Sequence, residues 1–206
     1  MRRGCFRSAL GAILLLSGAG HAVASEAWAA AFAETFRAAC VPERLSYEGT
    51  LAQARSEGWA DFAPAGHVEF AAMLEKTDDA LREAEEDLPG MTYRQETFAQ
   101  DVEGRPLYLV VSFAQSEYLD AVGCYLYDFD ATEPVPASAI SNLLGIKPAR
   151  SHRDETMIAY VWGPPPGMPR TLDTYLIFVP AGSPYADQAG FDGQVLKFTT
   201  SAPEAG

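Results

Sequence analysis

One short basic segment is the strongest candidate for ligand binding. Arg150, His152 and Arg153 lie within four residues of one another in a chain that is otherwise strongly acidic. Guanidinium groups hold carboxylates and phosphates through paired, charge-assisted hydrogen bonds. We therefore predict that Arg150, His152 and Arg153 bind an anionic group. A solvated loop that precedes a strand is the alternative interpretation of the same residues.

Aromatic residues on an expected strand are a second candidate. Tyr125, Tyr127 and Phe129 stand two residues apart, so they point to the same face of a strand. Neighbouring strands could add further tyrosines to this group, namely Tyr108, Tyr160 or Tyr175. An aromatic pocket for a ligand fits this pattern, and so does cross-strand aromatic packing beneath a helix.

The sequence contains no metal, cofactor or nucleophile motif. Outside the first 24 residues the only histidines are His67 and His152, which are far apart, whereas zinc sites draw on closely spaced ligands. Residues 128–133 begin like a calcium loop, but the sixth position is not glycine and Ala139 stands at the twelfth. Motifs for a serine nucleophile or a phosphate loop are also missing. We expect no metal and no cofactor, and we name no catalytic residue.

The first 24 residues have the three parts of a secretory signal peptide. Three arginines within the first seven residues precede an apolar run at 9–16. Residues 22–24 then supply the small-x-small pattern that a signal peptidase recognises, which makes Ser25 the expected mature N-terminus. An uncleaved anchor is the weaker interpretation, because the run has about half of the ~20 residues needed to span a bilayer. We therefore predict a periplasmic or secreted protein.

The remaining chain, residues 25–206, is long enough for one domain with a sizeable core. The full chain has a net charge of −13, and loss of the three N-terminal arginines leaves 12 basic and 28 acidic residues, or −16. This charge argues against nucleic acid as a partner. No later segment is apolar enough to predict a membrane span. The acidic surface favours solubility, with a docking surface for a cationic partner as the alternative.

Two cysteines, Cys40 and Cys124, remain in the expected mature chain. A pair of cysteines in an oxidising compartment forms a disulfide when the two Cα atoms approach within about 7 Å. We predict a bond between Cys40 and Cys124. Two separate buried thiols, or a reactive cysteine paired with His152, are the alternatives.

Helices come first along the chain and strands follow. Apolar periodicity and caps predict helices over residues 26–39, 47–57, 67–87 and 136–144. Alternating or continuous apolar runs predict six strands, at 92–102, 107–113, 122–129, 157–162, 174–179 and 194–199. Residues 164–169, rich in proline, form a stiff connection or an extended segment that docks on a partner. This order predicts an α+β fold, with the N-terminal helices on one face of a mainly antiparallel sheet of about five or six strands.

Three segments of the sequence are similar to segments of known proteins. They are the helix that places Phe32, Phe36 and Cys40 at four-residue spacing, the segment from Ala52 to Gly58 and Trp59, and the strand around Cys124 followed by Ile140 to Gly145. Together they resemble small exported proteobacterial proteins of unknown function. The resemblance implies export and carries no active site with it.

The sequence therefore predicts an exported, non-catalytic module that binds a small molecule or a protein. An extracytoplasmic hydrolase that uses carboxylates is the first alternative, because aspartate and glutamate are abundant although no pair stands out. A subunit of an envelope assembly is the second.

Overall fold

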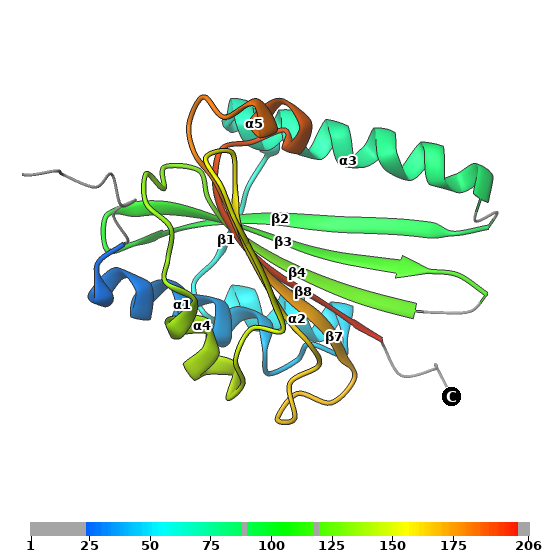
Figure 1. Ribbon diagram of the computed structural model, residues 1–206. Helices are drawn as coiled ribbons and strands as arrows, with labels where there is room; N and C mark the ends of the chain where they lie inside the picture. The colour runs from blue at the N-terminus through cyan, green and yellow to red at the C-terminus, as the bar shows by residue number, and fades with distance from the viewer. Residues whose placement is uncertain (1–23, 88–89, 118–119, 202–206) are drawn as a thin grey trace, which may run out of the picture.

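The computed structural model describes residues 24–87, 90–117 and 120–201 (Figure 1). The expected signal peptide, except Ala24, lies outside these residues. The helices are α1 (Glu26–Cys40), α2 (Tyr47–Ser56), α3 (Val68–Asp87), α4 (Ala137–Leu144), α5 (Pro184–Ala189) and a 3-10 turn at Pro64–Gly66. The strands are β1 (Ala60–Asp61), β2 (Thr92–Val102), β3 (Arg105–Gln115), β4 (Asp120–Asp128), β5 (Arg150–Arg153), β6 (Ile158–Trp162), β7 (Thr171–Val179) and β8 (Gly193–Ser201).

The strands form one sheet in the order β1-β2-β3-β4-β8-β7-β6-β5, in which every neighbouring pair is antiparallel. The fold is therefore α+β, as predicted. The expected count of five or six strands is wrong, because the sheet has eight. The two additional strands, β1 and β5, lie at the sheet edges, and all of their residues are exposed. Exposed edge strands lack the apolar alternation that reveals a strand in a sequence.

One face of the sheet is covered by α1, α2 and α4 (Figure 1). We call it the disulfide face, because Cys124 on β4 forms a disulfide with Cys40 at the end of α1, with a Cα–Cα distance of 5.9 Å. The side chain of Ser25 accepts a hydrogen bond from the backbone N–H of Trp28 and so caps α1. Phe36 of α1 packs edge-on against Phe198 of β8. The predicted disulfide is thus confirmed, and it lies in the main core.

The opposite face, which carries Tyr125 and Tyr127, is the tyrosine face. Helix α3 lies over it (Figure 1), and its residues Phe70, Met73 and Leu74 are buried there. The prediction that the N-terminal helices share one face is therefore wrong for α3. An apolar stripe shows that a helix packs on a sheet, but it does not show on which side.

Residues 164–169 connect β6 to β7, and Met168 within this segment is buried in the main core on the disulfide face. Arg44 Nη2 donates a hydrogen bond to the carbonyl of Pro169, which fixes the end of the connection. Within the residues described, no helix is both long and apolar enough to cross a membrane.

Peptide mapping without reduction should recover residues 40 and 124 in one linked fragment. The Cys40→Ala/Cys124→Ala variant should lose about 2–4 kcal/mol of unfolding free energy, because an 84-residue loop is no longer closed in the unfolded chain. Chemical denaturation measures this loss, and reduced wild-type protein should match the variant. Recovery of both residues as free thiols from protein purified without reductant would contradict the assignment.

Candidate functional site

The part of the tyrosine face that lies away from the start of α3 is only partly covered. A single cross-strand row runs over it from Tyr125 through Lys197, Tyr175 and Val161 to Arg150. The first four side chains are half-buried, and Arg150 at the edge is exposed. On the disulfide face the neighbouring residues of β4, β8 and β7 are buried. The central strands are therefore sealed on one side of the sheet and accessible on the other.

A cleft of 440 Å³ lies on this accessible region, between α3 and α5. Its apolar lining includes Leu81, Ile177, Phe191 and Val195, and Lys197 lies on its wall. The cleft exists because α3 loses its apolar stripe. After Leu74 the next large apolar residue of the helix is Leu81, and the intervening positions are mainly charged or small. The second half of α3 thus cannot seal the sheet as the first half does.

Contacts between α3 and α5 fix the width of the cleft. The Lys76 ammonium on α3 donates a hydrogen bond to the carbonyl of Asp187 on α5. Gly190, which ends α5 with φ +83°, lies so close to α3 that a Cβ there would be 3.1 Å from Met73 Cα. Only glycine satisfies both the left-handed backbone and this close approach.

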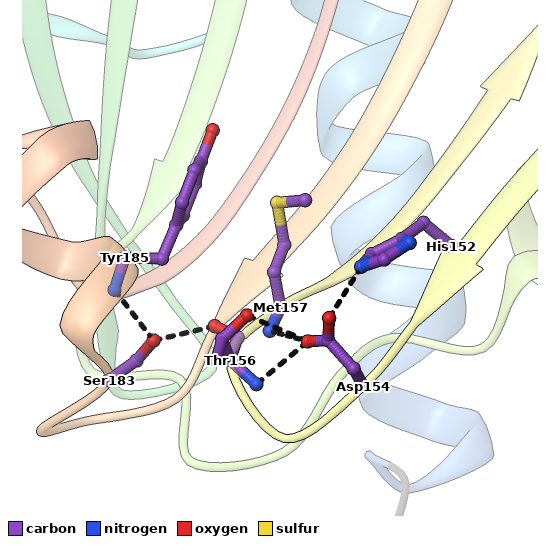
Figure 2. Close-up of polar contacts among 6 residues, drawn as sticks. All are labelled: His152, Asp154, Thr156, Met157, Ser183 and Tyr185. Carbon is purple, nitrogen blue, oxygen red and sulfur yellow. Dashed lines mark hydrogen bonds and ion pairs between the residues drawn. The ribbon is translucent and has the colours of Figure 1, made fainter.

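The start of α5 is tied to the turn between β5 and β6 (Figure 2). The Ser183 hydroxyl donates to the carbonyl of Thr156 at 2.6 Å and accepts from the N–H of Tyr185 at 3.1 Å. Tyr185 in turn lines the cleft. The turn itself is closed by Asp154, whose Oδ1 accepts from the N–H and hydroxyl of Thr156 and from the N–H of Met157.

These hydrogen bonds hold the Asp154 carboxylate in its charged form and keep its pKa well below the usual range, with a further contribution from His152. His152 Nε2 lies 2.8 Å from Asp154 Oδ2 (Figure 2). Of the predicted ligand-binding residues, His152 is therefore part of the framework that positions α5.

The structure separates the three predicted ligand-binding residues. They all lie on β5, where alternation directs Arg150 and His152 to the tyrosine face and Arg153 to the disulfide face. Arg150 forms an exposed ion pair with Asp173 at 3.6 Å, and Arg153 donates to the Tyr160 hydroxyl at 3.0 Å. Anion binding by Arg150, His152 and Arg153 stays a prediction. The three residues lie on an exposed edge strand and not on the loop of the alternative interpretation.

The predicted aromatic group is also divided. Tyr127 and Phe129 stack under α3 together with Tyr108, which is the packing alternative. Tyr160 lies on the disulfide face against Trp162. On the tyrosine face, Tyr125 and Tyr175 are half-exposed, and they flank Lys197.

Lys197 is the residue that sequence reasoning missed. Its Nζ lies 5.8 Å from the ring centroid of Tyr125 and 5.6 Å from that of Tyr175. Burial lowers the pKa of its ammonium group. Among the ion pairs of the described residues, none includes Lys197. A lysine within a predicted strand looks like an ordinary solvent-facing residue until the strand is known to be central.

A second, acidic hollow of 520 Å³ lies on the other side of α5, lined by Glu69, Asp187 and Asp192. Partial burial raises the pKa of Glu69, and the nearby carboxylates of Asp192 and Asp130 raise it further. No group of three or more metal-binding side chains occurs in residues 24–87, 90–117 and 120–201. The hollow therefore offers carboxyl chemistry without a recognisable metal centre.

Asp128, the first residue of the segment that resembles a calcium loop, points into the core. Its side chain is 1 % exposed and forms an ion pair with Arg105 at 2.8 Å. The Arg105 guanidinium also lies 4.0 Å above the ring of Trp28. Burial raises the pKa of Asp128 to about 6 in spite of Arg105. This carboxylate therefore joins β3, β4 and α1 and is not available to a surface ion.

Comparisons with family models, with curated proteins and with solved structures find no match to this chain. The geometry of the site is therefore the basis for inferring a function.

The raised pKa of Asp128 predicts a specific pH dependence of stability. A carboxyl whose pKa is higher in the folded than in the unfolded chain stabilises the fold below about pH 4, and the effect is lost as pH rises through about 6. Relative to Asp128→Asn, the wild type should therefore lose about 1 kcal/mol of unfolding free energy between pH 5 and pH 7.5. Urea denaturation at each pH measures this difference. The control Asp78→Asn, at an exposed position of α3, should show the same pH dependence of unfolding free energy as the wild type. If Asp128→Asn also shows the wild-type pH dependence, the raised pKa of Asp128 is wrong.

Proposed function

We propose that this protein is an exported, non-catalytic binding module that holds a small ligand in the cleft between α3 and α5. The observation that carries the proposal is Lys197, a half-buried ammonium without a carboxylate partner beside an apolar cleft. Partial burial of an unpaired charge destabilises a fold, and such groups gather at functional sites. A ligand in the cleft would give the lysine the partner that the described chain does not supply.

Export is supported by two independent features. The N-terminal residues have the pattern of a cleavable signal, and the Cys40–Cys124 bond is compatible with an oxidising compartment. Cleavage after Ala24 would leave Ser25, whose side chain caps α1, as the first residue. The mature chain would then begin directly at the cap of α1.

A hydrolase that uses carboxylates is the alternative function, and the acidic hollow favours it. Acid–base catalysis by two carboxyl groups needs environments that push their pKa values apart. Glu69, with its raised pKa beside Asp192, would be the acid in such a pair. The binding module is the better-supported function because the cleft also has the apolar lining that small ligands need.

Filling the cleft should abolish ligand retention. Ala80 is an exposed residue of α3 that lines the cleft, so Ala80→Trp should occupy it without disturbing the core. Native mass spectrometry of protein purified from its source compartment should show a one-to-one small-molecule adduct on the wild type and none on Ala80→Trp. Saturable binding of the neutral dye Nile red should weaken at least tenfold in parallel.

The matched control is Ala52→Trp, at an exposed position of α2 on the opposite side of the sheet. It should behave like the wild type in both measurements. A wild type without an adduct, which also binds Nile red no better than Ala80→Trp, would contradict the proposal.

A further inference from the structure

We infer that the ligand of the cleft is a small amphipathic carboxylate, whose charged group meets Lys197 while its apolar body lies between α3 and α5. This inference rests on the proposed binding function and adds the chemical class of the ligand. It follows from the charge, the apolar lining and the size of the site.

The charge of the ligand follows from the surroundings of Lys197. Its position is central, since β8 lies between β4 and β7 and the lysine is flanked on both sides by tyrosine. Among the described residues its ammonium group forms no ion pair, and it lies over the Tyr125 and Tyr175 rings, whose faces offer no strong hydrogen-bond acceptor. An ammonium has three N–H donors, so a carboxylate is the partner that satisfies charge and hydrogen bonding together.

Nearby groups limit the ligand to a single negative charge. Lys76, the other cation of the cleft wall, already donates to the Asp187 carbonyl. Arg150, at the end of the same cross-strand row, is paired with Asp173. Among the described residues, Lys197 is the cation of the cleft wall without a hydrogen-bond or ion-pair partner. In a chain of net charge −13, the acidic surroundings suit a monoanion better than a phosphate dianion, which they repel more strongly.

The rest of the cleft selects an apolar body. The apolar part of the lining that Lys197 shares includes Leu81 of α3, Ile177 of β7, Phe191 and Val195. Tyr125 is held flat beside the lysine because its ring lies over Gly123, where a Cβ would come within 2.6 Å of the tyrosine hydroxyl. A cleft of 440 Å³ is near the lower end of ligand sites, which suits a short acyl chain or a single ring.

Three probes that share an eight-carbon chain test the inference: octanoate, octanol and octyltrimethylammonium. Isothermal titration calorimetry on the disulfide-intact protein should give octanoate a Kd at least tenfold lower than that of octanol, and the cation should bind most weakly. Lys197→Met should bring octanoate to the level of octanol and leave octanol binding unchanged. Lys197→Gln should do the same and serves if the methionine variant folds poorly.

Lys147→Met is the matched control, because Lys147 is exposed beyond the end of α4 on the other side of the sheet. It should preserve the preference for octanoate. Equal binding of octanoate and octanol, or an unchanged preference in Lys197→Met, would overturn the ligand class.

The variant Ala80→Trp separates failure of the class from failure of the site. If it abolishes octanol binding while Lys197→Met has no effect, the cleft is the site and only the carboxylate assignment is wrong. If Ala80→Trp binds all three probes as tightly as the wild type, both the carboxylate inference and the proposed binding in the cleft are wrong. If none of the three probes binds the wild type, the carboxylate inference is wrong.

Discussion

The register of β4 is the constraint on which the rest of the structure depends. Its alternation directs Val122, Cys124 and Leu126 toward α1 and sends Tyr125 and Tyr127 to the other face. A slip of one residue would exchange the two sets, and it would remove both the disulfide and the aromatic layer under α3. The bond between Cys40 and Cys124 links this register covalently to the first helix, so the sealed and accessible sides of the sheet are fixed together.

The cleft between α3 and α5 forms because helices cover the tyrosine face of the sheet less completely than the disulfide face. Helices α1, α2 and α4 together seal the disulfide face, whereas α3 and the short α5 share the tyrosine face. Helix α3 packs through Phe70, Met73 and Leu74 and then becomes too polar to continue. Ile177 of β7 and Lys197 of β8 are left half-covered, and polar contacts of α5 hold the gap at a fixed width. A cleft formed in this way is largely ready before a ligand arrives, which lowers the entropic cost of binding.

Features that depend on local pattern could be predicted from the sequence. The disulfide follows from two cysteines at the core-facing positions of a helix and a strand. Strands β3 and β4 have the apolar runs that define them, and β2 has an interrupted alternation. Features that depend on tertiary placement could not. The edge strand β5 is a polar tetrapeptide, and its pairing with β6 is decided by backbone hydrogen bonds and not by its side chains. Lys197 could not be recognised because the strand order, which places β8 between β4 and β7, is not visible in the chain order.

The same row of the sheet contains two kinds of cation, and burial decides their different roles. Arg150 at the edge is exposed and pairs with Asp173, so solvent and salt screen its interactions and an added anion gains little from it. Lys197, three strands further in, is half-buried between two tyrosines and has no ion-pair partner within the part of the chain that the structure describes. A charge in a less polar environment interacts more strongly with an incoming anion, because less water competes for it. We therefore expect an anionic ligand to bind at Lys197 in the centre of the sheet rather than at the basic cluster of the edge strand β5.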